Sequence, residues 1–216
     1  MWKVLKHSAH LLLHLLFPDL CCHCGKSGRY LCRACVRLVD FHMEPIFLTA
    51  DSPLSSVTSA FTHSPPISNL ITTLKYSFIK GVASYLGELL YLHTNYPDVD
   101  AVTFVPLSKE KQRMRGFNQA EEIARALGQL TQLPVLPLLI RTQSSRSSQA
   151  SLHSKHERLL NAKHQVFHYN TKIRAPTRVL LIDDVYTTGA TLEACAVVLK
   201  QHGVKEVHGL VIAHGS

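Results

Sequence analysis

The sequence is short of acidic residues and of cysteines beyond residue 35, and it has no long apolar run. Its 216 residues include 15 aspartates and glutamates against 23 lysines and arginines, a formal net charge of +8, and 14 histidines add charge as the pH falls. A hydrophobic content of 46% excludes a disordered or collagen-like chain. The positive charge predicts an anionic partner: nucleic acid, membrane headgroups or a small phosphorylated ligand.

No apolar stretch is long enough to cross a bilayer as a helix, so no membrane insertion is expected. Residues 9–17 follow two lysines and superficially resemble a signal peptide. They contain His10 and His14, however, and run into Pro18 without the small residues of a cleavage site. We therefore expect an amphipathic helix on the body of the protein, in which His7, His10 and His14 form a polar stripe rather than a metal site.

Cysteines are nearly absent outside residues 21–35, where five of the six lie; the sixth, Cys195, is alone in a helical pattern. This distribution excludes a chain-wide disulfide framework and favours a metal site in a cytoplasmic protein. Two Cys-x-x-Cys pairs suit tetrahedral Zn²⁺. Cys22 or His23 could replace one ligand, and free thiols or a redox pair are the alternatives. The predicted structural zinc ligands are Cys21, Cys24, Cys32 and Cys35.

The rest of the chain alternates predicted helices and strands, which indicates an α/β fold with a mostly parallel sheet covered on both faces. Three parts are expected: a helix and zinc-finger-like module (1–40), a connection with an edge strand (41–66) and the main domain (67–216). Loops are expected at 106–115 and 141–151, the second as a lid. The predicted strands are 57–62, 99–105, 135–140, 165–169, 178–183 and 207–213. The predicted helices are 66–76, 80–92, 118–130, 155–162 and 191–202.

The strongest motif covers residues 179–191, where an apolar run leads into two acids and a Thr-Thr-Gly-Ala-Thr turn. Open α/β sheets bind ligands at the carboxyl ends of their strands. Backbone N–H groups of the turn can cradle a phosphate, and Gly189 allows close approach. Asp183 and Asp184 would repel that phosphate but can accept hydrogen bonds from a neighbouring diol. Phosphate beside a diol describes a ribose 5-phosphate, and an ordinary strand–turn–helix junction is the alternative.

This motif resembles the phosphoribosyl pyrophosphate (PRPP) fingerprint of class I phosphoribosyltransferases over all 13 positions, with one departure, Tyr186, where the fingerprint favours an aliphatic residue. Residues 105–108 and 113–120, the latter with Arg-Gly-Phe-Asn-Gln, resemble the ComF/GntX group of competence proteins. So do the N-terminal helix and its two Cys-x-x-Cys pairs. Later matching positions are Gln149, Leu152, Arg158 and Asn161, so the resemblance runs over nearly the whole chain.

The resemblance implies a sheet of the class I phosphoribosyltransferase type with an N-terminal zinc-ribbon-like module that has four cysteine ligands. It also implies a part in handling incoming single-stranded DNA in natural transformation, with the competence machinery as partner. PRPP or a related nucleotide would bind with Mg²⁺, held largely by pyrophosphate and ribose oxygens. The implied PRPP-binding residues are Asp183, Asp184, Thr187, Thr188, Gly189, Ala190, Thr191, Ser108 and Lys109, with the two aspartates also as catalytic candidates. The implied lid, 141–152, contains Arg141, Arg146 and Gln149.

Whether the chain is an enzyme stays open. A transferase would move ribose 5-phosphate from PRPP to a base and release pyrophosphate, with Lys109, Arg113, Arg115 or Arg146 stabilising the leaving group. No acceptor-recognition element is identifiable, although residues 41–80 could form one. A binding protein would instead hold single-stranded DNA on its basic loops, and a PRPP sensor is a third hypothesis.

The positive charge is concentrated in one part of the chain. Residues 101–178 hold 13 of the 23 basic residues and only 4 of the 15 acidic ones. This segment leads from the first strand of the expected site to the PRPP fingerprint, so the charge is expected to face phosphate rather than a membrane. Phe117 is the best-placed aromatic residue for base stacking, but we expect it to pack in the core.

Overall fold

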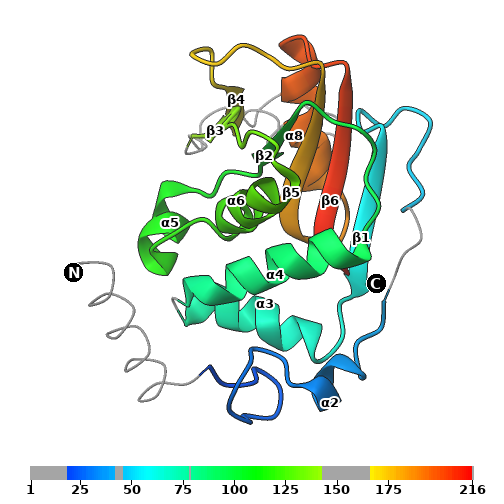
Figure 1. The fold of residues 1–216 in the computed structure, drawn as a ribbon. Helices are drawn as coiled ribbons and strands as arrows, with labels where there is room; N and C mark the ends of the chain where they lie inside the picture. The colour runs from blue at the N-terminus through cyan, green and yellow to red at the C-terminus, as the bar shows by residue number, and fades with distance from the viewer. Residues whose placement is uncertain (1–18, 42–45, 78, 143–165, 216) are drawn as a thin grey trace, which may run out of the picture.

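The computed structural model describes residues 19–41, 46–77, 79–142 and 166–215, and shows an α/β fold around a parallel sheet (Figure 1). Among these residues, four strands pair in the order β1-β6-β5-β2, all parallel. Burial on both faces explains the nearly continuous apolar runs of the strands. Their bounds are β1 (Ser56–Thr62), β2 (Ala101–Phe104), β5 (Arg178–Tyr186) and β6 (Glu206–His214).

The predicted strand 135–140 is wrong as a single element. Its first part borders β2: the Val102 N–H donates to the Pro134 carbonyl, and the Leu136 N–H to the Val102 carbonyl, both at 2.9 Å. Pro137, which has no N–H to donate, lies at the break. Beyond it, β3 (Leu139–Arg141) pairs antiparallel with β4 (Phe167–Tyr169) in a separate two-stranded sheet.

Helices cover both faces of the main sheet (Figure 1). Leu86, Leu90, Ile123 and Leu127 are fully buried against one face, whereas α8 packs on the other face beside β3 and β4. The predicted helices 66–76, 80–92, 118–130 and 191–202 are confirmed within a few residues. The observed bounds are α3 (Ile67–Tyr76), α4 (Lys80–His93), α6 (Gln119–Thr131) and α8 (Ala190–Gln201).

The predicted loop 106–115 contains a helix instead, α5 (Lys109–Arg115). The Ser108 hydroxyl caps its start by accepting a hydrogen bond from the Lys111 N–H at 3.3 Å. Gly116, with a left-handed φ of 72°, ends it. No residue of α5 is buried, so the sequence offers no apolar periodicity that could reveal the helix.

The cysteine module is built around tight turns and one short helix, α2 (Arg33–Val36). Its buried residues Cys21, Leu31 and Cys35 belong to the same hydrophobic core as α3 and α4. Among the helices that the structure describes, none is long and apolar enough to cross a membrane. The predicted N-terminal amphipathic helix and the predicted helix 155–162 lie outside the described residues.

Candidate functional site

The chain connections diverge between β2 and β5. From β2 the chain passes through α6 and returns at residues 134–136, on the outer side of β2. From β5 it passes through α8 and returns as β6, on the opposite side. Such a switch point leaves a crevice beyond the strand ends, where open α/β sheets bind ligands. Here it is bordered by the loop 105–108 and by the end of β5 with the turn 187–189.

Asp183 and Asp184 both lie at this crevice, but on opposite faces of the sheet. The prediction ended the strand at Asp183, whereas β5 continues beyond both acids, so the pleat still alternates their side chains. Asp183 shares the α8 face with Leu181, and Asp184 shares the other face with Ile182. On that second face, Lys75 Nζ lies 2.9 Å from Asp184 Oδ2. The side chains of the two acids therefore approach the carboxyl edge of the sheet from its two opposite faces and do not lie next to each other.

Lys75 is a site residue that the sequence analysis missed. It lies in the last turn of α3, next to the fully buried Leu74, and its side chain is only 22% exposed. A lysine beside an apolar helical stripe is normally a solvated surface charge, so its position in the sequence carries no signal. Only the packing of α3 near the end of β5 brings it to Asp184.

The environment of Asp183 favours its protonated form. Burial and the charge of Asp184 raise its pKa from 3.8 to about 7, although the Asp184 N–H donates to Asp183 Oδ1 at 2.9 Å and Lys75 and Arg141 oppose the rise. The buried thiol of Cys195, in α8, also has a raised pKa because of burial and the Asp183 charge. Cys195 is completely buried and packs in the core.

The turn after β5 forms a small hollow of about 20 Å³ lined by Asp183 and residues 185–192. Gly189, with a left-handed φ of 73°, precedes α8, and no side chain caps the first N–H groups of this helix. Uncapped N–H groups at a helix start can bind an anion. The structure thus gathers the predicted phosphate-binding residues in one turn: Thr187, Thr188, Gly189, Ala190 and Thr191.

We expect Gly189→Ala to damage this turn. The new Cβ would occupy a left-handed conformation and collide with the Tyr186 hydroxyl. The free energy of unfolding should fall by about 2 kcal/mol or more, measured by urea denaturation. Gly203→Ala is the matched control, since its φ is 100° but no atom lies within 4 Å of the new Cβ. An equal loss of unfolding free energy in the two variants would show that the collision with Tyr186 does not destabilise the protein.

Arg-Gly-Phe-Asn-Gln, the most specific part of the ComF resemblance, forms the turn between α5 and α6. The Asn118 side chain caps α6 by accepting from the Ala120 N–H at 3.1 Å, and it donates to the Val105 carbonyl at 3.0 Å. The Val105 N–H in turn donates to the Ile182 carbonyl at 3.0 Å. Phe117 is buried, as expected. These contacts fix the loop that ends at Ser108, and with it the start of α5 at Lys109, next to β5.

The described part of the predicted lid is Arg141, at the end of β3, and Thr142. The Arg141 guanidinium lies over the Phe167 ring, 5.2 Å from the ring centroid, and its charge acts on Asp183. Arg141 is therefore a second cation near the acids, on the face opposite Lys75. Arg146 and Gln149 lie outside the described residues.

The four predicted zinc ligands come together. One sulfur each from Cys21, Cys24, Cys32 and Cys35 lies within 4.8 Å of the others. The Cys32 N–H donates to Cys21 Sγ at 3.5 Å, and Cys24 Sγ lies 3.6 Å from Cys32 Sγ. All six cysteines are free thiols. Four sulfurs at this separation suit a tetrahedral ion such as Zn²⁺.

The two alternative ligands, Cys22 and His23, stand outside the cluster and contact α3 instead. His23 Nδ1 lies 3.2 Å from Asn69 Nδ2, and Cys22 lines a pocket together with Thr73. These contacts tie the module to the helix that carries Lys75.

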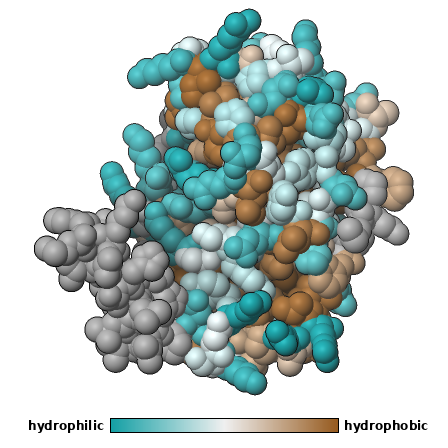
Figure 2. Space-filling model, in the orientation of Figure 1, coloured by the Kyte–Doolittle hydropathy of each residue, from teal (hydrophilic) through white to brown (hydrophobic). Residues whose placement is uncertain are grey.

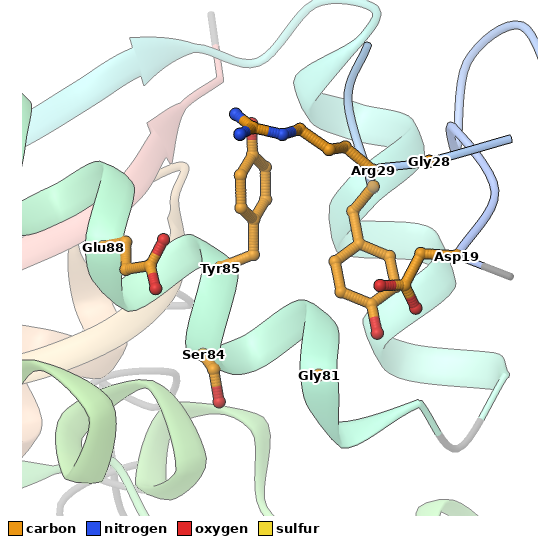
Figure 3. Close-up of a pocket in the computed structure, with 8 residues that line it drawn as sticks. Asp19, Gly28, Arg29, Gly81, Ser84, Tyr85 and Glu88 are labelled. Atoms are coloured by element: carbon orange, nitrogen blue, oxygen red, sulfur yellow. The ribbon is translucent and has the colours of Figure 1, made fainter. Parts of the chain in front are cut away.

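A groove runs between the module and α4. One part, of about 280 Å³, is lined by Tyr30, Tyr85 and Glu88, with Arg29 extended toward Tyr85 (Figure 3). The two tyrosine ring centroids are 6.1 Å apart. An adjoining hollow of about 420 Å³ shares Arg29 with the first. The module arginines that line this second hollow are Arg29, Arg33 and Arg37.

Comparisons with known proteins point to one family. The model of the phosphoribosyl transferase domain matches residues 113–215. Competence protein ComFC of Streptococcus pneumoniae is 32% identical over 159 residues, which cover 68% of this chain and 63% of that protein, slightly under two thirds. Competence protein F of Haemophilus influenzae is 28% identical, covering 88% of this chain and 82% of that one. DNA utilization protein YhgH of Escherichia coli K12 is 26% identical, covering 87% and 81%.

Two solved structures show a more distant similarity. They are the allosteric regulatory enzyme of purine biosynthesis and glutamine PRPP amidotransferase from B. subtilis complexed with ADP and GMP. Their identities are 19% and 21%, and both have a TM-score of 0.42 over 60% of this chain and 25% of theirs. Values this low say nothing about the ligand of this chain.

Proposed function

This chain belongs to the ComF family of competence proteins with a phosphoribosyltransferase domain, and from that premise we propose that it binds PRPP with Mg²⁺ at the carboxyl edge of the sheet. The observation that carries the proposal is the hollow after β5 at the switch point of the sheet. Uncapped N–H groups and threonine hydroxyls there suit a 5-phosphate, and the adjacent acids suit ribose hydroxyls. One anion with a diol satisfies both halves of the crevice.

The division of roles follows from the residues. Thr187, Thr188 and the first N–H groups of α8 would hold the 5-phosphate. Asp183 and Asp184 would accept hydrogen bonds from the ribose hydroxyls, and Ser108 and Lys109 would face the pyrophosphate. Mg²⁺ would neutralise the pyrophosphate charge and be held mainly by ligand oxygens and water, in keeping with its preference for such ligands.

Calorimetric titration with PRPP, with and without Mg²⁺, tests this proposal. Saturable binding that requires Mg²⁺ supports it, and no binding in either condition overturns it. A screen of free bases for pyrophosphate release then separates the alternatives. Release with any base would identify a phosphoribosyltransferase moving ribose 5-phosphate from PRPP, and binding without release would identify a PRPP-binding protein.

We further propose that the protein takes part in handling incoming single-stranded DNA in natural transformation, in line with the names of its relatives. The basic helix α5 supports a direct contact. It lies next to the crevice, and hydrophilic side chains gather over it in Figure 2. At its end, the Arg115 guanidinium lies 5.7 Å from the centroid of the exposed Tyr76 ring. Basic side chains beside an exposed aromatic ring are the usual features of single-strand binding.

Neutralising α5 should weaken DNA binding. For Lys111→Gln with Arg113→Gln, we expect lower affinity for an oligothymidine. The slope of log affinity against log salt should be shallower by about 1.4, since each lost phosphate contact removes about 0.7. Fluorescence anisotropy at several salt concentrations measures both. Arg33→Gln with Arg37→Gln, on the module groove, is the matched control; if it alone lowers the slope, the DNA lies on the module rather than on α5.

We propose that the four-cysteine cluster is a structural zinc site. Four protein thiolates complete a tetrahedral shell and leave no position for a catalytic water. The ion would therefore stabilise the module and its packing on α3 and α4.

A further inference from the structure

The acid pair at the end of β5 has a counter-ion from a distant part of the chain. Lys75 Nζ and Asp184 Oδ2 are 2.9 Å apart, and their side chains are only 22% and 18% exposed. The other lysine ion pair among the described residues, Lys80 with Glu122, is more open, with the lysine side chain 63% exposed. An ion pair removed from water is screened less by salt and solvent than a surface pair.

We propose that Lys75 is a positioning residue of the ribose site: its ammonium holds the Asp184 carboxylate in place and offsets its charge, so that the crevice accepts an anionic sugar phosphate. This inference rests on the PRPP site proposed above. Without Lys75, two acids would face a ligand that itself carries several negative charges, and like charges repel at short range. With it, the α3 side of the crevice has no net charge.

The geometry around Lys75 fits a fixed position rather than a mobile surface chain. The neighbouring Leu70, Ile71 and Leu74 are buried and anchor α3 in the core. The helix α3 ends at Tyr76, so Lys75 lies in its last turn. The helix dipole favours a cation at this end of a helix. A lysine held in this way can orient one carboxylate oxygen and leave the other free to accept from a ribose hydroxyl.

The other titratable groups near Asp184 lie on its own strand and on neighbouring elements. Asp183 is on the same strand, Arg141 faces it from β3, and the buried thiol of Cys195 faces it from α8. Arg115 lies over the Tyr76 ring at the end of α3. Only Lys75 forms an ion pair with Asp184 among the described residues. Removing the Lys75 charge should therefore favour protonation of Asp183, with Arg141 as the cation that remains.

The test measures Mg²⁺-PRPP affinity by calorimetry between pH 6 and 9 for the wild type, Lys75→Met, Lys75→Arg and the control Lys80→Met. We expect Lys75→Met to bind about 10- to 100-fold more weakly, as for the loss of a hydrogen bond between charged groups. Its pH midpoint for binding should rise by about 1 unit. Lys75→Arg should restore both values to near wild type, and Lys80→Met should change neither.

Thermal unfolding of each variant separates positioning from folding. If Lys75→Met binds Mg²⁺-PRPP like the wild type and with the same pH midpoint, the proposed positioning role of Lys75 is wrong. It is also wrong if Lys75→Met loses affinity through unfolding and Lys75→Arg does not rescue it. A wild type that binds no Mg²⁺-PRPP would instead overturn the proposed PRPP site itself, a result that the variants cannot mimic.

Discussion

Replacing both acids, Asp183→Asn with Asp184→Asn, is expected to reduce Mg²⁺-PRPP affinity by at least about 100-fold while the chain stays folded. Each carboxylate is assigned hydrogen bonds from ribose hydroxyls, and a hydrogen bond to a charged group contributes about 1.5–3 kcal/mol. The loss of two such contacts therefore exceeds about 3 kcal/mol, which corresponds to more than about 100-fold in affinity. Calorimetric titration at pH 8 measures the change, and circular dichroism checks the fold.

Asp100→Asn is the matched control for this variant. Asp100 pairs with Arg178 at 3.0 Å at the opposite, amino edge of the same two strands, far along β5 from the acids. Its replacement removes an aspartate from the sheet without touching the crevice, so PRPP affinity should stay at the wild-type value. Unchanged binding in the double variant would refute the assignment of the acids to ribose, and an equal loss in the control would mean that the sheet, not the site, was disturbed.

The raised pKa of Asp183 gives this binding a pH dependence. In the folded protein the pKa is about 7, against an ordinary value of 3.8, so folding favours the protonated acid. The stabilisation that protonated Asp183 gives the ligand-free folded protein is complete below about pH 4. It is lost as the pH rises through about 7. Ribose hydroxyls, in contrast, bind best to the ionised acid. The gain in melting temperature on adding Mg²⁺-PRPP should therefore be larger at pH 8 than at pH 6.

The sequence was informative where a feature is local. Most of the alternating helices and strands, the cysteine spacing and the Thr-Thr-Gly-Ala-Thr turn are each encoded in consecutive residues. The structure has four of the predicted helices within a few residues, brings the four cysteines together and gathers the turn residues around one hollow. The capping role of Asn118 could also be read from its position before an apolar helical stripe. Local hydrogen bonds and periodicity decide such features, so tertiary contacts change them little.

Features that depend on packing were not predictable. The break at Pro137 sends one predicted strand into two sheets, and α5 has no buried face that would distinguish it from a loop. The opposite orientations of Asp183 and Asp184 follow from the continuation of β5, which is set by its pairing with β6 as far as Tyr186. Lys75 reaches Asp184 across more than a hundred residues of sequence, and only the tertiary fold creates that contact.

Removal of the proposed zinc ion is expected to cost the protein several kcal/mol of stability. Cys24→Ser is the sharpest variant, because Cys24 is exposed and its replacement leaves no cavity. Metal analysis should find one zinc per wild-type chain and almost none in Cys24→Ser, and the free energy of unfolding should fall by at least about 3 kcal/mol, since structural zinc binding is folding free energy. Cys22→Ser, outside the cluster, should keep its zinc.

The effect of zinc loss should also reach the PRPP site. His23 contacts Asn69 of α3, Cys22 lines a pocket with Thr73 of the same helix, and α3 carries Lys75 to Asp184. Loosening the module should free α3, so Cys24→Ser or a chelator should weaken Mg²⁺-PRPP binding as well as stability. Zinc retained in Cys24→Ser, or lost equally from Cys22→Ser, would refute the ligand set. Zinc loss with unchanged PRPP affinity would show that the sheet and α4 hold α3 in place without the module.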